Sequence, residues 1–458
     1  MSDAQMFRSE FPAKIKSRSM GVKLLIVCAL ALAMTIPALF VEALVNDRTH
    51  RAGDVVKEIS SHVGGQQTFL GPTLAVPYSI SAHSPQESPR HGTYFVFPAE
   101  ATATVKIATE ERRRSLFRVP VFQADLKLDA AFDLASVPAD APEGAVLDWS
   151  RAEFIVGVTD ARGALADGVV TLGGKSFTLM PSQIAENLTI GSESNQQLRL
   201  KLFGTTAGQL ATGSKLDVSA QMRFCGAQRI ALLAYGKTTQ LNMQGDWPNP
   251  SFDGGFLPAN RTVTPSGFRA EWTVPFIARG VRAEGGVDSI RALDATALGA
   301  SFVEVADPYQ SVNRSLKYVL LFLGLLFLTY FVFEVTTGKR VHPAQYVLVG
   351  VAQIIFYLLL LSLAERIGFD YGFLIAGTAT VTLLSVNTGW IFTSLALALR
   401  ALVVFTLLYA LIYMLLRLED NALLVGAIAS FLAVTAAMYL TRSIDWYGSL
   451  PQTSTTNS

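Results

Sequence analysis

Two long apolar runs joined by a short polar link dominate the second half of the chain. They cover residues 318–335 and 346–364, and the link is residues 336–345. Each run is about as long as a helix needs to cross the hydrocarbon core of a bilayer. Glu334, at the end of the first run, is the only charged residue in either run. The pattern predicts a helical hairpin in a membrane.

The polar link carries Lys339, Arg340 and His342 and no acidic residue. Because basic loops stay on the cytoplasmic side of a membrane, we expect the link to lie there. Pro343 suits the first turn of the second helix, where its missing N–H costs nothing. Two interpretations of Glu334 stay open. It pairs with His342 or Arg340, or it only reaches the interfacial water.

Another apolar run lies near the N-terminus, at residues 24–45, and four basic residues precede it: Lys14, Lys16, Arg18 and Lys23. Such a run is either a cleaved signal peptide or an uncleaved anchor. Its length, and the lack of a small-x-small cleavage site before Asn46, favour the anchor, with the N-terminus in the cytoplasm. Pro37 should kink this helix, which a bilayer span tolerates.

Three further apolar runs follow the hairpin, at residues 371–390, 399–416 and 422–440. Together with the first run and the hairpin they make about six spans. Arg400 and Arg442 fall on the side of the hairpin link, whereas the opposite loops balance their arginines with acids. This alternation predicts that both termini are cytoplasmic and that residues 46–317 are periplasmic.

The long middle region has a different pattern, because apolar and polar residues alternate along it. Residues 116–128 are the clearest example of this period of two, which is typical of a half-buried strand. Gly173 and Gly174 lie between two such runs and predict a hairpin turn. Residues 46–61 have an amphipathic pattern that extends the first helix, and residues 293–298 are the best candidate for a short helix.

The predicted fold class is a membrane protein, an α-helical bundle of about six transmembrane helices plus a large, mainly antiparallel β extracytoplasmic domain. The expected segments are a cytoplasmic N-terminal segment (1–23), a first transmembrane helix (24–45), a periplasmic β-rich domain (46–317), a five-helix transmembrane region (318–441) and a disordered cytoplasmic tail (442–458). A middle region of about 270 residues is large enough to bury its own core.

Composition, net charge and cysteine count limit the classes of protein to which this chain can belong. Half of the residues are hydrophobic and 16% are charged, below the ~25% of an average soluble domain. The formal net charge of +1 gives no overall field that would recruit nucleic acid or an anionic surface. Cys28 and Cys225 are the only cysteines, which excludes a disulfide framework. The expected partners are the lipid bilayer and a protein in the periplasm or the membrane, with no nucleic acid.

The sequence lacks the common motifs of catalysis and metal binding. Its five histidines form neither an HExxH pair nor a Cys/His cluster, and His83 and His91 read as solvated loop residues. Nucleophile-elbow, SxxK and phosphate-loop motifs are missing as well. We therefore predict no enzyme activity, no catalytic residue, no cofactor and no metal.

Charged and polar residues elsewhere have an ordinary structural interpretation. Residues 110–114 read as a solvated hairpin tip, with a site for anionic lipid or polysaccharide as the alternative. Residues 160–163 read as a turn closed by an ion pair rather than a ligand site. Polar residues of the spans read as interface anchors and interhelical hydrogen-bonding groups, with a transport path as the alternative: Glu42, Glu334, Gln353, Glu365, Asn387 and Thr388.

Several motifs, in the same order, resemble the CreD family of inner-membrane proteins. They lie at residues 71–77, 160–163, 247–258, 331–334, 340–350, 356–362 and 441–447, and so cover nearly the whole chain. Asn249 stands where we expect a histidine in that family, which argues against metal binding at this position. The resemblance implies a role in cell envelope integrity, under a CreB/CreC-type two-component system in many members. It implies no catalytic residues.

Three functions stay open. The chain is an inner-membrane protein of envelope integrity or stress response, whose periplasmic β domain binds an envelope component or a partner. Alternatively, the helical bundle is a transporter or flippase, or the β domain is a periplasmic enzyme whose site is assembled only in the folded chain. A closed bundle favours the first, a hydrated cavity at the bilayer midplane the second, and a deep cleft lined by facing acids or bases the third.

Overall fold

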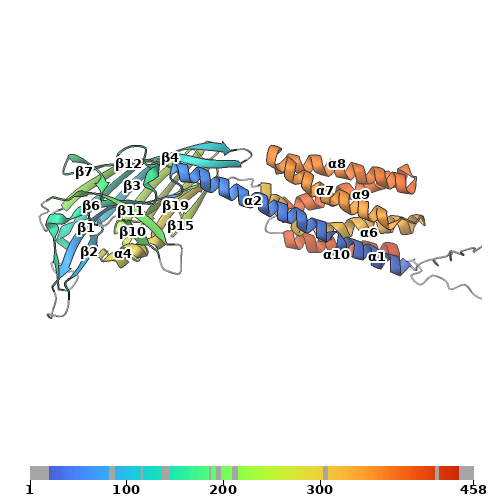
Figure 1. The fold of residues 1–458 in the computed structure, drawn as a ribbon, viewed down its shortest axis with the longest axis horizontal. Helices are drawn as coiled ribbons and strands as arrows, with labels where there is room; N and C mark the ends of the chain where they lie inside the picture. Colours follow the sequence, from blue (N-terminus) through green and yellow to red (C-terminus); the bar gives the residue numbers. More distant parts are fainter. Residues whose placement is uncertain are drawn as a thin grey trace, which may run out of the picture. The chain divides into compact units, whose positions relative to one another are not determined.

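The computed structural model describes residues 20–81, 88–114, 117–136, 144–184, 187–191, 197–208, 215–302, 308–417 and 422–442. The chain divides into two compact units, one helical and one built of β-sheets (Figure 1). The helical unit comprises Met1–His50 and Ala306–Ser458, and the β unit is Arg51–Val305. His83 lies outside the described residues.

Helices build the helical unit, most of them long and apolar. They are α1 (Met20–Ala33), α2 (Thr35–Val63, which continues into the β unit), α5 (Pro308–Lys317), α6 (Val319–Thr337), α7 (Pro343–Ile367), α8 (Phe369–Phe392), α9 (Leu395–Arg417) and α10 (Ala422–Thr441). Within the described residues, five spans are long and apolar enough to cross a membrane, with α1 and α2 counted as one. Helix α10 adds a further apolar helix of 20 residues. The predicted class, a bundle of about six helices with a large β domain, is confirmed.

The helix at the N-terminus is interrupted at Met34, one turn before Pro37. A proline ring clashes with the carbonyl four residues earlier, here that of Ala33, and cannot donate to it. Helix α1 ends at this residue, and Ala38 N donates to Met34 O at 3.4 Å. The interruption lies where Pro37 acts, and the kink itself stays a prediction. The Met34 side chain packs onto Gly350 of α7, where a Cβ atom would crowd it.

The hairpin of α6 and α7 turns at two residues with special backbone roles. Gly338 ends α6 in the left-handed conformation (φ 68°), which costs glycine little. His342 caps α7, since its Nδ1 accepts a hydrogen bond from Ala344 N at 3.2 Å, and Pro343 occupies the first turn. The position predicted for Pro343 is confirmed.

Helix α5 belongs to the helical unit and has two faces of opposite character. Tyr309, Val312 and Leu316 are buried on one face, and the helix packs against α7. Asn313, Arg314 and Lys317 line a small polar pocket on the other side. At ten residues α5 is too short to cross a bilayer. The predicted β-rich domain, residues 46–317, included this helix.

Two large sheets form the β unit. The first contains β1 (Gln67–Ile80), β2 (Arg90–Val96), β5 (Ala145–Leu147), β6 (Glu153–Val158), β9 (Met180–Pro181), β10 (Asn187–Ile190), β11 (Leu198–Thr206), β13 (Arg229–Leu233), β15 (Pro250–Gly254), β18 (Glu284–Gly285) and β19 (Ala297–Phe302). The second contains, in spatial order, β16 (Asn260–Thr264), β17 (Gly267–Val274), β14 (Thr238–Gly245), β3 (Glu100–Arg114), β4 (Phe117–Asp133), β12 (Lys215–Ala227), β7 (Val169–Leu172) and β8 (Lys175–Thr178). All described pairs are antiparallel except β1 with β13 and β14 with β3.

A single hydrophobic core joins the inner faces of both sheets. Strand β4 shows how the alternation predicted for residues 116–128 works: Phe122, Leu126 and Leu128 are buried, while Gln123 and Lys127 are exposed. The predicted hairpin at Gly173–Gly174 joins β7 to β8, and both glycines have positive φ (55° and 77°). Strand and turn predictions that rest on local pattern are thus confirmed here.

The end of α2 packs onto the β unit, as the amphipathic pattern of residues 46–61 predicts. Val56, Ile59 and Val63 lie against Val119 and Val121 of β4. The chain then reverses through Gly64 and Gly65, both with positive φ.

Three short helical segments accompany the sheets: α3 (Phe276–Arg279), α4 (Val287–Arg291) and the 3-10 helix η4 (Ala292–Thr296). Further single 3-10 turns are η1 (Leu134–Ser136), η2 (Trp149–Arg151) and η3 (Ala161–Gly163). The short helix predicted at residues 293–298 is only partly right, because residues 297 and 298 begin β19. Pairing with β13 and β15 on both sides draws these two residues into the sheet.

Candidate functional site

The most strongly held polar group of the helical unit is the carboxylate of Glu334, on α6. Its side chain is 2% exposed. It forms an ion pair with Lys23 Nζ of α1, and it accepts hydrogen bonds from Val341 N at 3.0 Å and Tyr346 Oη at 3.1 Å. Lys23 Nζ also donates to Val341 O at 2.9 Å. One buried carboxylate therefore fastens α1, α6 and α7 together.

Neither interpretation offered for Glu334 is correct, because its partner is Lys23 rather than His342 or Arg340, and it is buried rather than exposed to interfacial water. His342 is occupied in capping α7. Arg340 is exposed to solvent. The sequence carries no specific signal for the true pair, since a lysine that directly precedes an apolar run ordinarily reaches interfacial water.

The other basic residue of the α6–α7 link joins it to the next turn between helices. Lys339 Nζ donates to Phe392 O and, at 2.5 Å, to Thr393 Oγ1. Phe392 ends α8, where the carbonyl groups carry the negative end of the helix dipole. Lys23, Lys339 and the α8–α9 turn consequently lie at one end of the helical unit.

A second set of charged residues gathers around the α7–α8 turn and the end of α9. Glu365 accepts a hydrogen bond from Tyr309 Oη at 3.0 Å and lies 3.9 Å from Arg48 Nη1. Asp370 pairs with Arg417 and accepts from Tyr413 Oη at 3.0 Å. These bonds place acids and bases together at the opposite end of the unit from Lys23 and Lys339.

Neutral hydrogen bonds join the helices in the interior between these ends. Tyr409 Oη donates to Gln353 Oε1 at 2.7 Å, which links α9 to α7. Tyr330 Oη donates to Leu384 O at 3.0 Å and accepts from Thr388 Oγ1 at 3.1 Å, which links α6 to α8. The prediction that Gln353 and Thr388 make interhelical hydrogen bonds is confirmed.

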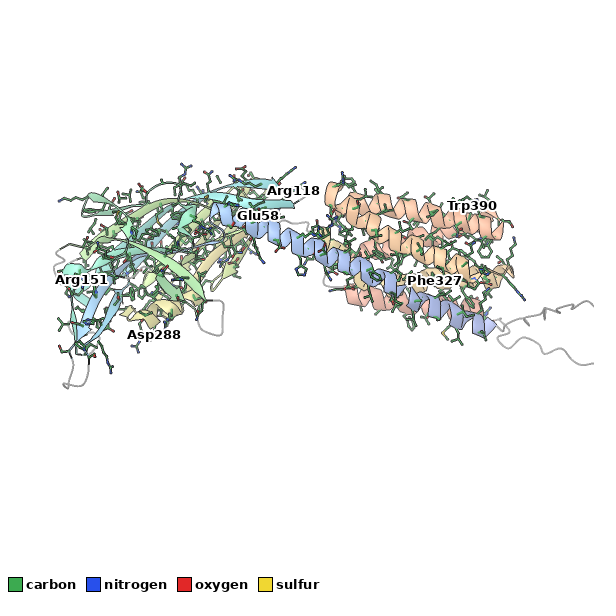
Figure 2. All side chains as sticks on the ribbon, viewed as in Figure 1. Glu58, Arg118, Arg151, Asp288, Phe327 and Trp390 are labelled. Carbon is green, nitrogen blue, oxygen red and sulfur yellow. The ribbon has the colours of Figure 1, made fainter. Side chains whose placement is uncertain are left out.

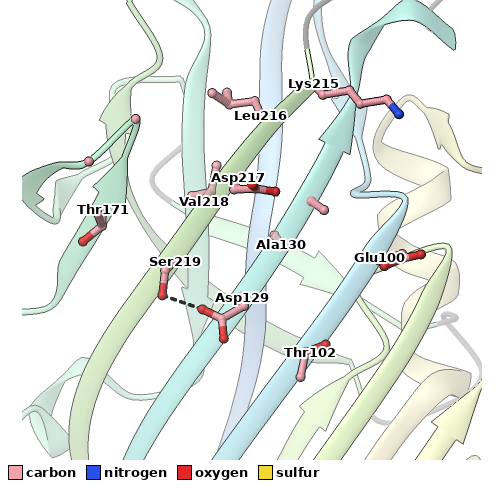
Figure 3. Close-up of a pocket in the computed structure, with 13 residues that line it drawn as sticks. Glu100, Thr102, Asp129, Ala130, Thr171, Lys215, Leu216, Asp217, Val218 and Ser219 are labelled. Atoms are coloured by element: carbon pink, nitrogen blue, oxygen red, sulfur yellow. Dashed lines mark hydrogen bonds between the residues drawn. The ribbon is translucent and has the colours of Figure 1, made fainter.

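A polar groove of about 620 Å³ lies on the outer face of the eight-stranded sheet (Figure 3). Strands β3, β4, β7 and β12 supply its lining, which includes Glu100, Thr102, Asp129, Thr171, Lys215, Asp217 and Ser219. Asp129 is held in place, because it accepts from Ser219 Oγ at 2.6 Å and pairs with Lys127 Nζ at 3.1 Å. Carboxylates and hydroxyls at this density can hydrogen-bond a polar, hydrated ligand.

The groove residues come from four strands whose outward positions alternate with core positions, so a period of two places them on one face. Sequence reasoning missed the groove because its members are spread from Glu100 to Ser219. Within the part of the chain that the structure describes, no three histidine, cysteine or acidic side chains gather as metal ligands.

The motif at residues 247–258 has a structural explanation. Asp253 accepts hydrogen bonds from Arg229 Nε at 2.8 Å and from Ser301 Oγ, and thereby joins β13, β15 and β19. Gly254 has φ of 107°, and a Cβ at Gly255 would overlap the carbonyl of Ala295. This motif therefore specifies how β15 passes close to the η4–β19 segment.

Residues 160–163 form the predicted turn with a local ion pair, since Arg162 Nη2 lies 2.6 Å from Asp160 Oδ2. The hydrogen bond from Arg162 lowers the pKa of the Asp160 carboxyl below its usual range. Beneath the turn, Gln67 is fully buried and its Nε2 donates to Gly64 O at 2.8 Å and to Asp160 O at 2.9 Å. The turn thus anchors the start of β1.

Residues 110–114 form the end of β3 in its hairpin with β4. Glu111 lies 3.8 Å from Arg113 and 3.9 Å from Arg118, and all three side chains are exposed. His91, also exposed, is on β2 rather than in a loop, because β2 pairs with β1 along its whole length.

The apolar helices with internally paired charges, together with the two-sheet unit, define a multi-helix membrane protein with a large β unit. Comparison with known proteins agrees. The family model for "Inner membrane protein CreD" matches residues 19–447. The Inner membrane protein CreD of Escherichia coli (strain K12) is 30% identical over 436 residues, covering 92% of both chains. The chain belongs to the CreD family, and its helical unit lies in a lipid bilayer of the inner membrane.

Proposed function

We propose that this chain is a non-catalytic protein of cell envelope integrity, in which the helical unit is the membrane anchor and the β unit binds a polar envelope component. The polar groove on the eight-stranded sheet carries this proposal. Its acids and hydroxyls, held on a rigid sheet, match a hydrated glycan or a polar protein surface better than an apolar ligand.

The proposal also assigns the two sides of the membrane. The end with Lys23 and Lys339 is cytoplasmic, as are both termini, and the β unit is periplasmic. Support comes from the charge at the two ends. The first has Lys23, Lys339 and the exposed Arg340 with one acid, Glu334, whereas the second balances Arg48 and Arg417 with Glu365 and Asp370. An excess of lysine and arginine marks the cytoplasmic side.

Cysteine labelling tests this orientation. In a variant lacking Cys28 and Cys225, single cysteines replace Ser176 on β8 or Arg340 in the α6–α7 link, both exposed positions. We expect an impermeant maleimide to label the Ser176→Cys variant in intact spheroplasts, and the Arg340→Cys variant only after lysis. Equal labelling of both in intact spheroplasts would contradict the assignment.

Survival under envelope stress tests the role of the groove. A strain that lacks the gene receives either the wild-type chain or the double variant Glu100→Lys and Asp217→Lys, which reverses two exposed charges of the groove. The control is Asp288→Lys, an exposed carboxylate on α4 that is labelled in Figure 2.

We expect the wild-type chain and the control to restore growth in a membrane-perturbing detergent, and the groove variant to fail at equal membrane abundance. Full rescue by the groove variant would show that the groove is not the binding site. Wild-type growth of the gene-deleted strain under every stress tested would refute the role in envelope integrity.

A further inference from the structure

Among the residues that the structure describes, Arg279 is a buried cation without an anionic partner. It is 3% exposed, and its Nε, Nη1 and Nη2 atoms have no hydrogen-bond partner within the described ranges. The guanidinium carries five N–H donors, all of which hydrogen-bond water when it is exposed. Burial alone lowers its pKa to about 10. Leaving these donors unsatisfied is costly, so the position calls for a physical explanation.

The contact that the guanidinium does make is insufficient as compensation. Its central carbon lies 4.3 Å from the centre of the Phe97 ring, which is a cation–π interaction. Such an interaction returns less free energy than burial of an uncompensated charge costs. The half-buried Glu284 lies on β18, a few residues further along the chain, and no ion pair joins it to Arg279 among the described residues; burial is the cause of the lowered pKa of Arg279.

The same turn exposes its apolar residues. Helix α3 has only four residues, and Ile277 is 92% exposed and Phe276 47% exposed, directly before the buried Arg279. The polarity of this turn is therefore inverted relative to a surface in contact with water, where the charge would be outside. Large exposed apolar side chains at one place commonly mark a binding surface.

The backbone at each end of α3 would allow this turn to move as a rigid segment. Pro275 precedes it in an extended conformation, and Gly280 follows it in the left-handed conformation with open space around the position of a Cβ. Four residues contribute few buried contacts, and such segments open at low free-energy cost. Opening would bring the guanidinium to the surface beside Phe276 and Ile277.

We propose that residues 275–280 bind an anionic phospholipid, whose headgroup pairs with Arg279 and whose acyl chain covers Phe276 and Ile277. A guanidinium matches a phosphate with two parallel hydrogen bonds. An anion with an apolar tail would accept hydrogen bonds from the unsatisfied donors of the turn and would also cover its exposed apolar side chains. This site is separate from the polar groove, which is built from β3, β4, β7 and β12.

Binding of a soluble short-chain lipid to the full chain in nanodiscs tests the proposal. The probe is dihexanoylphosphatidylglycerol below its micelle-forming concentration, and the comparison ligands are dihexanoylphosphatidylcholine and inorganic phosphate. Calorimetry gives the affinity, and hydrogen exchange of the amides at residues 276–282 locates the site. We expect the anionic lipid to bind at least tenfold more tightly than either comparison ligand, with a change in exchange at these amides.

Variants separate the two halves of the interaction. Arg279→Met keeps the volume of the side chain, and it should raise the melting temperature without ligand while weakening lipid binding at least tenfold. Ile277→Ser should weaken binding of the lipid but not of phosphate. The matched control is Arg261→Met, which removes an exposed arginine from β16 and should change neither quantity.

Two results would overturn the proposal. Unchanged lipid affinity in the Arg279→Met variant, with a folded β unit, would show that Arg279 is not part of a lipid site. Equal affinity for inorganic phosphate and for the anionic lipid would show an anion site that does not recognise an acyl chain.

Discussion

Neutralising Glu334 tests the link between α1 and the α6–α7 hairpin. In Glu334→Gln the amide oxygen can still accept the hydrogen bond from Val341 N, and the amide N–H can donate to Tyr346 Oη in place of the bond that the second carboxylate oxygen accepted, so the change mainly leaves Lys23 without its anion. Removing one member of a buried ion pair costs about 3–5 kcal/mol. Because the Lys23 side chain is 20% exposed and keeps some contact with water, we expect the lower end, about 3 kcal/mol.

A double-mutant cycle isolates the pair from the rest of the site. The combination of Glu334→Gln with Lys23→Met removes both charges, and replacing a whole buried pair with neutral groups is often close to neutral. We therefore expect the double variant to recover about 2 kcal/mol relative to the sum of the single changes. The assay is the denaturant midpoint of the full chain in nanodiscs, with abundance in the membrane as a second measurement.

Arg340→Gln is the control, because it removes a neighbouring exposed charge. Loss of stability in Glu334→Gln no larger than in this control would refute the reasoning, and so would additive effects of the two single changes. Normal stability of Glu334→Gln together with lost tolerance of envelope stress would instead assign the carboxylate a functional role.

Three further predictions concern the β unit. Gly255→Ala should lower the melting temperature and membrane abundance, since its Cβ would overlap Ala295 O, whereas Gly173→Ala, in open space though at positive φ, should cost less. The hydrogen bond from Arg162 lowers the pKa of Asp160, so ionised Asp160 stabilises the folded chain at pH values above the pKa of Asp160 in the unfolded chain. This stabilisation is lost as the pH falls through the lower pKa of the folded chain. In the Asp160→Asn variant, the melting temperature should no longer show this decrease at acidic pH. Burial raises the pKa of the Cys225 thiol, so maleimide should modify it more slowly than a cysteine introduced at Ser176.

The parts of this fold that sequence could predict depend on neighbouring residues. Apolar length fixes the spans, a period of two fixes β4, and Pro37, Gly338 and Pro343 act on the helix turn in which they lie. Helix α5 was not predicted, because a helix of ten residues is too short to span a membrane and this one follows a strand-rich region. At residues 297 and 298, pairing on both sides overrode the local preference for helix.

Contacts between distant residues account for the rest. Lys23 and Glu334 are 311 positions apart, so the basic residues close to Glu334 in sequence looked like better partners. The groove gathers residues from four strands, and only their shared sheet brings them together. Arg279 looks like an ordinary surface arginine in the sequence, and the Phe97 ring that it contacts in the fold lies far away along the chain.

Lys23 and Arg279 are both cations removed from water, and the same substitution should affect them in opposite directions. Lys23 faces a carboxylate, so Lys23→Met leaves Glu334 buried and unpaired and should lower stability. Within the described residues Arg279 faces an aromatic ring and no acid, so Arg279→Met removes an uncompensated charge and should raise stability. A residue that costs the free protein stability needs another reason to be there, and binding of an anion supplies one. Measured melting temperatures of the two variants would separate a structural ion pair from a ligand-binding residue; a decrease in both would show that Arg279 has an anionic partner within the folded chain.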